Sequence, residues 1–218
     1  MVDIAGKPMI QRVYEQCSKA NSLNKVIVAT DDVRIFEVVK QFGGHAVMTS
    51  QHHLNGTSRC AEVIEQETNF DFAINIQGDE PFIHPKQIDD LAFLFKDSDA
   101  QIITQVKKET DISLLQNPNI VKAILNNDSF AVDFKRTIQQ STDNIPYFYK
   151  HIGIYGFKTT VLKEIVHLTP TTNELQQHLE QLRWLDNNYK IKVGITTYES
   201  ISIDIQEDLE KVRKTLNF

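Results

Sequence analysis

The chain has few cysteines, no long apolar run and no excess of basic residues. Cys17 and Cys60 are the only cysteines among 218 residues, too few for a disulfide scaffold or a four-cysteine zinc site. No apolar segment approaches the ~20 residues of a membrane-spanning helix, and the N-terminus lacks the pattern of a secretory signal. The net charge of −6 opposes binding along a nucleic-acid backbone. These absences predict a cytoplasmic protein with neither a membrane nor a nucleic-acid partner, while a small phosphorylated ligand is still allowed.

The first half of the sequence alternates short β-branched segments with amphipathic helices. Residues 25–30 and 70–76 have the apolar character of buried parallel strands, and 45–49 predicts a further strand. Asp31 or Asp32 can cap the helix that follows the first of these strands. The glycine pair at 43–44 is suited to end that helix. This alternation predicts a parallel sheet with right-handed crossovers.

The second half adds an antiparallel excursion. Residues 121–125 and 130–134 flank a turn and predict a hairpin, and 151–157 and 191–196 predict two further strands. Helices are expected over 161–167 and 174–185, with a last one from about Glu207. Together the two halves predict one α/β domain over residues 1–218, with a mixed, mainly parallel sheet.

Two carboxylates lie on loops next to a predicted strand or helix. Asp79 follows the most apolar strand, and Asp204 precedes the last helix. Ligands of open α/β sheets bind beyond the carboxyl ends of the strands, and Mg²⁺ prefers one or two protein carboxylates plus phosphate and water oxygens. The alternative for each residue alone is a helix cap or a turn. Spacing by itself therefore predicts a Mg²⁺-dependent enzyme that acts on a phosphorylated substrate.

Other polar residues have ordinary structural alternatives. Arg59 lies just inside a helix start that can face an anion, although a surface arginine is the simpler interpretation. The His52-His53 pair favours solvated side chains over a metal site. His151 and Tyr155 share one strand face, and Gly153 between them leaves room for a ligand or for another backbone.

Eight motifs run through the chain in a fixed order and give a resemblance. The sequence resembles the 3-deoxy-manno-octulosonate cytidylyltransferases, also called CMP-Kdo synthetases. QGDEP, HIGIYGF and LEQLR together separate this family from its CMP-sialic acid relatives. The motifs are DIAGKPMI (3–10), VIVATDD (26–32), GTSRCAEV (56–63), NIQGDEPFI (75–83), NPNIVKAI (117–124), HIGIYGF (151–157), LEQLR (179–183) and IDIQEDLEKV (203–212).

The resemblance implies a Rossmann-like nucleotidyltransferase domain that joins CTP to 3-deoxy-manno-octulosonate (Kdo), releasing pyrophosphate, for lipopolysaccharide biosynthesis. It implies a cytoplasmic homodimer with Mg²⁺ as cofactor. The residues carried over fall into three groups by role. Asp79 and Asp204 are the catalytic metal ligands; Arg59, Gln77 and Gly78 bind the nucleotide; Arg136, His151, Tyr155, Glu180 and Gln181 bind the sugar acid.

Departures from the family pattern leave alternatives open. The family's first strand and its phosphate-binding loop have no counterpart before DIAGKPMI, Lys135 replaces a serine, and Ile205-Gln206 replaces Thr-Pro. The alternatives are a nucleotidyltransferase for another sugar acid, a catalytically impaired binding chain and, more distantly, a glycosyltransferase of similar design.

Overall fold

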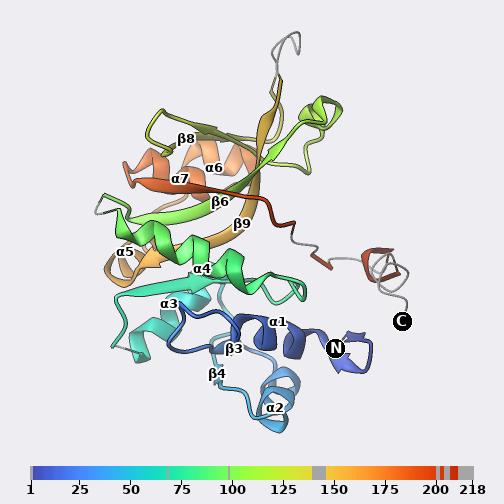
Figure 1. Cartoon of the computed structure of the whole chain (residues 1–218). Coiled ribbons are helices and arrows are strands. Elements are labelled where there is room, and N and C mark those ends of the chain that lie inside the picture. The colour runs from blue at the N-terminus through green and yellow to red at the C-terminus, as the bar shows by residue number, and fades with distance from the viewer. Residues whose placement is uncertain are drawn as a thin grey trace. The chain divides into compact units, whose positions relative to one another are not determined.

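The computed structural model describes residues 2–67, 69–97, 99–138, 146–199, 202–203 and 207–210 (Figure 1). The chain divides into two compact units. The first comprises Met1–Asn69, Asn75–Asp89 and Glu199–Phe218, and the second comprises Phe70–Ile74 and Asp90–Tyr198. A single domain over residues 1–218 stays a prediction. Within the described ranges, no helix is long and apolar enough to cross a membrane.

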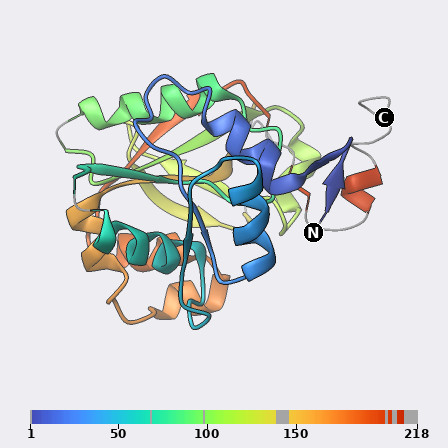
Figure 2. The same ribbon diagram turned by 90° about the horizontal axis from the view of Figure 1, so that it is seen from below.

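The described residues of the first unit form two small sheets, three full helices and a short helical segment at 207–210. Strands β1 (Asp3–Ile4) and β2 (Lys7–Pro8) form an antiparallel pair, and β3 (Val28–Thr30) lies parallel to β4 (Ala46–Met48). The helices are α1 (Met9–Cys17), α2 (Val33–Gln41) and α3 (Gly56–Gln66). Helices α1 and α2 are in contact, and both are visible in Figure 2. Strand β3 is shorter than the predicted 25–30.

Buried apolar residues explain why the first unit folds in this way. Val28, Val39 and Ala46 form a core shared by β3, α2 and β4. Asp32 caps α2 by accepting a hydrogen bond from the main-chain N–H of Arg34, which confirms the predicted cap. Gly43 follows α2 with φ +79°, a conformation that favours glycine at a helix end.

The second unit is built on a mixed sheet of six strands. The strand order is β10-β6-β9-β7-β8, and β5 also pairs with β9. The strands are β5 (Phe72–Asn75), β6 (Ile102–Glu109), β7 (Lys122–Leu125), β8 (Ala131–Lys135), β9 (Phe148–Lys158) and β10 (Ile191–Thr196). The helices are α4 (Pro85–Phe93), which begins in the first unit, α5 (Thr159–Ile165), α6 (Thr172–Gln177) and α7 (Glu180–Asp186). Short 3₁₀ turns occupy Leu94–Lys96 and Ile112–Gln116.

The strand directions confirm a mixed sheet with an antiparallel excursion. Strand β10 is parallel to β6, whereas β9 is antiparallel to both β6 and β7, and β7 is antiparallel to β8. The antiparallel share of this unit is therefore larger than the sequence predicted, because β9 extends three residues before the predicted 151 and pairs along all of β6. The hairpin of β7 and β8 is confirmed.

One predicted helix is two helices in the structure. The expected helix over 174–185 is wrong, because α6 ends at Gln177 and α7 begins at Glu180. His178 between them adopts a left-handed conformation with φ 53°, which cannot continue a right-handed helix. A capping box starts α6, in which the Thr171 side chain and Glu174 satisfy each other's main-chain N–H groups. Helix α7 packs against β8 (Figure 1).

Candidate functional site

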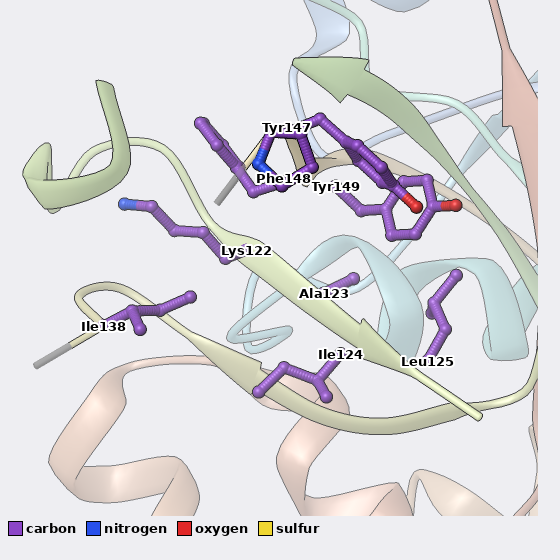
Figure 3. A pocket seen from close by; sticks show the side chains of 9 residues that line it. Lys122, Ala123, Ile124, Leu125, Ile138, Tyr147, Phe148 and Tyr149 are labelled. Carbon is purple, nitrogen blue, oxygen red and sulfur yellow. The ribbon is translucent and has the colours of Figure 1, made fainter. Parts of the chain in front are cut away.

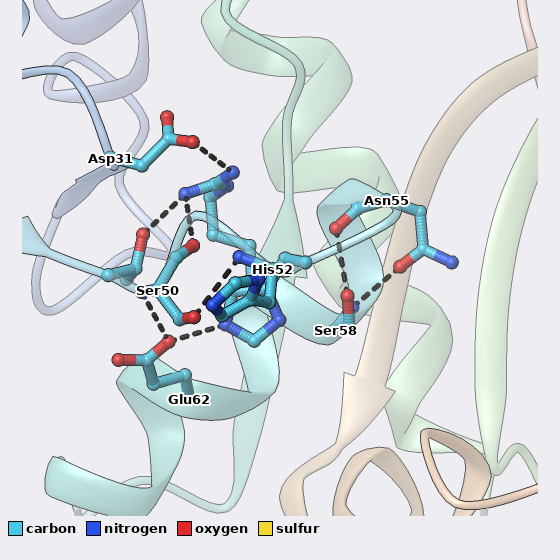
Figure 4. A network of polar contacts seen from close by, with 9 residues as sticks. Asp31, Ser50, His52, Asn55, Ser58 and Glu62 are labelled. Atoms are coloured by element: carbon cyan, nitrogen blue, oxygen red, sulfur yellow. Dashed lines mark hydrogen bonds and ion pairs between the residues drawn. The ribbon is translucent and has the colours of Figure 1, made fainter.

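Arg59 lies in a polar network at the start of α3. Its guanidinium forms an ion pair with Asp31 at 3.2 Å and donates hydrogen bonds to Thr49 Oγ1 at 2.6 Å and to the Ser50 carbonyl at 3.3 Å. Asp31, which follows β3, and Ser50, which follows β4, both face this network in Figure 4. The helix begins at Gly56 and is capped by Asn55, whose side chain accepts a hydrogen bond from the N–H of Ser58. Arg59 is thus held in place beyond the ends of two parallel strands.

A hydrogen bond between Glu62 and His53 closes the loop that precedes α3. Glu62 contacts His53 and also accepts a hydrogen bond from the main-chain N–H of Ser50 at 2.9 Å. The hydrogen bond from His53 and that from Ser50 lower the pKa of Glu62. The N–H of His52 donates to Ser50 Oγ instead. The two histidines therefore have different partners and do not share a site.

Gly56 brings the start of α3 against the loop that carries Gln77. A Cβ added to Gly56 would lie 2.7 Å from the side-chain nitrogen of Gln77 and 3.1 Å from that of Asn75. Only glycine permits this approach without a shift of those side chains. A Cβ on Gly78 would make only an ordinary contact with Ile10. The structure therefore brings together two of the segments that the sequence assigned to the nucleotide, GTSR and QGD.

Asp79 lies on the same loop, and its main chain contacts the C-terminal part of the first unit. The N–H of Ile203 donates a hydrogen bond to the Asp79 carbonyl at 2.9 Å. Ile203 is buried with Ile4 and Leu209. Asp204, the second expected metal ligand, lies outside the described residues. In the described part of the chain, no cluster of three or more histidine, cysteine or acidic residues could hold a metal ion.

In the second unit, His151 and Tyr155 are neighbours on β9. Their ring centroids lie 5.4 Å apart, and the Tyr155 ring meets that of Trp184 edge-on at 5.0 Å. Burial lowers the pKa of His151 to about 3, so its imidazole is neutral. Burial and the negative charge of Glu180 both raise the pKa of Tyr155. The Tyr155 hydroxyl is buried and has no hydrogen-bond partner among the residues described.

Strand β9 has an irregularity between these two residues. Tyr155 pairs with Thr104 and Ile152 pairs with Gln105, so two residues of β9 lie between adjacent positions of β6. One of them is Gly153, which is exposed and has open space where a side chain would project. The shared face that the sequence predicted follows from alternation, and the two extra residues leave that parity unchanged while they bring His151 and Tyr155 opposite Val106 and Thr104.

The remaining predicted sugar-site residues lie at the junction of α6 and α7. Gln181 is buried in the first turn of α7, one residue after Glu180. Arg136 donates hydrogen bonds from Nε to the Gln177 carbonyl at 2.6 Å and from Nη2 to the His178 carbonyl at 3.1 Å. Its Nη1 donates to the Pro118 carbonyl at 3.1 Å. The guanidinium therefore holds the main chain just before Glu180.

Sequence reasoning missed several residues that support the site. It assigned no partner to Asp31, gave Arg183 no role beyond its place in the LEQLR motif, and did not consider Thr104 or Glu174. Arg183 forms two hydrogen bonds with Glu174, at 2.5 and 2.6 Å, in a buried pair. A buried polar residue within the apolar strand 102–106 was the available signal for Thr104.

A cavity beside the hairpin of β7 and β8 is lined by none of the predicted sugar-site residues. It has a volume of about 390 Å³ and is lined mostly by apolar side chains (Figure 3). Lys122 is buried at its edge, and its ammonium donates to the carbonyls of Asn117 and Arg136, both at 2.7 Å. Because its one cationic group is engaged with the main chain and no predicted sugar-site residue lines it, this cavity is no part of the candidate site.

Comparisons with known proteins agree with the motifs. A family model described as cytidylyltransferase matches residues 1–192. A 3-deoxy-manno-octulosonate cytidylyltransferase of Parabacteroides distasonis is 50% identical, over 97% of this chain and 88% of that protein. A protein of the same description from Bacteroides thetaiotaomicron is 46% identical, over 98% and 89%. The expectation that a first strand and phosphate loop are missing finds no support in these alignments.

Solved structures give the same fold. A CMP:2-keto-3-deoxy-manno-octonic acid synthetase complexed with CTP superposes with a TM-score of 0.92. It is 33% identical, and the match covers 99% of this chain and 90% of that one. A 4-diphosphocytidyl-2C-methyl-D-erythritol synthase of Anaerococcus prevotii, 15% identical with a TM-score of 0.66, shares the fold alone; that match covers 99% of this chain and 88% of that one.

Proposed function

This chain belongs to the 3-deoxy-manno-octulosonate cytidylyltransferase family, and we propose that it transfers the cytidylyl group of CTP to Kdo. The observation that carries the proposal is the 50% identity to a relative of that description over nearly the whole chain. The packing of the GTSR segment against the QGD loop through Gly56 supports it independently, because two distant motifs meet there.

The reaction is a displacement at phosphorus. The 2-hydroxyl oxygen of Kdo attacks the α-phosphorus of CTP, a new P–O bond forms, and the bond to the β-phosphate bridging oxygen breaks. Pyrophosphate leaves, and the hydroxyl proton passes to solvent or to a nearby base. Such a transfer depends mainly on positioning and on charge neutralisation, so the protein needs no covalent intermediate.

For the nucleotide, we assign Arg59, Gln77 and Gly78. Arg59 is half-buried and its planar guanidinium suits a phosphate oxygen. In the structure Asp31 and Thr49 hold that guanidinium in one orientation, so little side-chain entropy is lost when an anion binds. Gln77 would contact the nucleotide or the sugar from the adjacent loop.

For a metal ion, we assign Asp79 together with Asp204. Two carboxylates on loops match the oxygen ligands of Mg²⁺. The hydrogen bond between Ile203 and Asp79 supports this pairing, because Ile203 directly precedes Asp204 in the sequence. When bound, Mg²⁺ would neutralise charge on the phosphates during transfer. The chain's own contribution is to hold Asp79 through the main chain of a buried segment.

For the sugar acid, we assign Arg136, His151, Tyr155, Glu180 and Gln181. The buried Tyr155 hydroxyl has no partner among the described residues and suits a sugar hydroxyl. Arg136 has five N–H donors, of which three bind main-chain carbonyls, so two can still meet a carboxylate. The homodimer and the cytoplasmic location are part of this proposal and rest on the resemblance; light scattering that finds a monomer would contradict the first.

The decisive experiment measures pyrophosphate release with CTP, Mg²⁺ and Kdo, each omitted in turn. We expect release only when all three are present. Asp79→Asn should reduce turnover at least 100-fold while circular dichroism and the melting temperature stay near those of the wild type. Asp128→Asn, on the exposed turn of the β7 hairpin, is the matched control and should leave turnover unchanged.

Three outcomes would contradict the proposal. Full turnover of Asp79→Asn would remove the metal assignment. A higher kcat/KM with another acidic sugar would displace Kdo. A folded wild-type chain that binds CTP weakly and releases no pyrophosphate would favour the catalytically impaired binding chain.

A further inference from the structure

Thr104 is a fully buried hydroxyl in β6 that lies beside His151. Thr104 Oγ1 lies 2.7 Å from the Ile154 carbonyl, 3.3 Å from the Ile152 carbonyl and 3.0 Å from His151 Nε2. The two carbonyls belong to residues at the bulge in β9. The hydroxyl thus has three polar neighbours and a single proton to donate.

The carbonyls decide where that proton goes. A carbonyl oxygen can only accept, so the Thr104 hydroxyl donates to Ile154, its nearest neighbour. If it donated to His151 instead, two oxygen lone pairs would face each other at 2.7 Å. The hydroxyl oxygen must therefore accept from His151, which requires the proton of the neutral ring to be on Nε2. Nδ1 then carries the lone pair.

We propose that Thr104 is a positioning residue that fixes His151 in the Nε2–H tautomer, so that Nδ1 accepts a hydrogen bond from a hydroxyl of the sugar acid. The second part of this proposal, the hydrogen bond between Nδ1 and the sugar acid, rests on the proposed function. Among the residues that the structure describes, no hydrogen-bond partner of Nδ1 is present, whereas Nε2 is engaged. The neighbouring Tyr155 offers a hydroxyl, so the pair presents one acceptor and one donor to a polyhydroxylated ligand.

Aromatic contacts with two neighbouring rings support a single orientation of the His151 ring. The edge of the Phe134 ring meets His151 with centroids 5.0 Å apart, and Tyr155 lies on another side at 5.4 Å. Of the charged groups described, Glu180 acts on Tyr155, and burial alone shifts the pKa of His151. A neutral ring in a fixed tautomer is suited to recognise a hydroxyl rather than a carboxylate.

The first test needs no variant. ¹⁵N-histidine labelling of the full chain, with the His151 signals assigned by their loss in His151→Gln, reports which ring nitrogen is protonated. We expect a protonated Nε2 and an unprotonated Nδ1 in the ligand-free protein. An Nδ1–H tautomer would overturn the proposal, whatever the enzyme's activity.

The second test uses a matched pair of variants. Thr104→Val keeps the shape but removes the hydroxyl, and Thr104→Ser keeps the hydroxyl. For Thr104→Val we expect a mixture of tautomers and a KM for Kdo that rises roughly two- to tenfold, with the KM for CTP unchanged. Thr104→Ser should restore both readouts. An unchanged tautomer in Thr104→Val, or equal rises of both KM values, would show that Thr104 only packs.

These readouts separate the two proposals. In one outcome the wild type has the Nε2–H tautomer, Thr104→Val loses it, and the wild type shows no Kdo-dependent turnover. That outcome would support the role of Thr104 and contradict the proposed function. The reverse outcome is turnover with Kdo together with an Nδ1–H tautomer. It would support the proposed function and contradict the role of Thr104.

Discussion

The buried pair between Glu174 and Arg183 allows a quantitative prediction. Both side chains are about one-tenth exposed, and the carboxylate meets the guanidinium through two hydrogen bonds. The same carboxylate raises the pKa of Arg183 and accepts from the main-chain N–H of Thr171. Glu174→Gln keeps the shape and one acceptor oxygen, but it removes the negative charge and points an N–H₂ group at other donors.

We expect Glu174→Gln to lower the free energy of unfolding by about 3 kcal/mol. One lost charge-assisted hydrogen bond accounts for about 1.5–3 kcal/mol. The variant also leaves the largely buried guanidinium of Arg183 without its partner. Breaking a buried ion pair in this way costs ~3–5 kcal/mol, and we take the lower end of that range. Because Arg183 belongs to α7, the helix that also carries Glu180 and Gln181, the KM for Kdo should rise as well.

Urea unfolding followed by circular dichroism measures this loss. Asp99→Asn is the matched control, because Asp99 forms an exposed ion pair with Lys190 and should cost no more than about 0.5 kcal/mol. The double variant Glu174→Gln with Arg183→Met should be more stable than Glu174→Gln alone, since it removes the uncompensated charge. A loss of stability below about 1 kcal/mol for Glu174→Gln, close to that of the control, would refute the reasoning.

Three further predictions concern pH, thiols and the nucleotide. Burial lowers the pKa of His151 to about 3 from 6.5, so below pH 6.5 the unfolded chain binds a proton that the folded chain does not. Between pH 6.5 and 5 the wild type should therefore lose about 1–2 kcal/mol more stability in urea titrations than His151→Gln, and equal slopes would contradict the burial. Burial raises the pKa of both Cys17 and Cys60 to about 12, so neither should react with iodoacetamide at pH 8 until urea unfolds the chain, as mass spectrometry would show. Arg59→Lys cannot reproduce the paired contacts to Asp31 and Thr49, so steady-state kinetics should give a KM for CTP about tenfold higher with an unchanged KM for Kdo; an unchanged KM for CTP would remove Arg59 from the nucleotide site.

Local signals in the sequence predicted most elements of the fold. The hairpin of β7 and β8, the strand β10 and the cap at Asp32 all follow from residues close together in the chain. The sequence placed a helix start just before Arg59, and the structure fixes it at Gly56 because the side chain of Asn55 provides the cap. Helix ends depend on which of several polar residues reaches the free N–H groups, and composition does not decide this.

The division of α6 from α7 and the bulge in β9 were beyond local signals. The sequence around His178 has good helix formers, but the guanidinium of Arg136, about 40 positions earlier, binds the carbonyls that the break exposes. Likewise, the bulge in β9 depends on its pairing with β6, where the Thr104 hydroxyl donates a hydrogen bond to a carbonyl of the bulge. Contacts between distant residues, rather than propensity, decide both features.

Arg136 has a consequence for how this family can change during evolution. Its guanidinium joins the end of β8, the turn at Pro118 and the left-handed residue His178. A lysine has one nitrogen and cannot reach three carbonyls in the plane of a guanidinium. Because these acceptors are main-chain atoms, the residue type at position 178 can change while Arg136 is kept, and a graft of the α6–α7 segment into a relative should be accepted only with arginine at position 136.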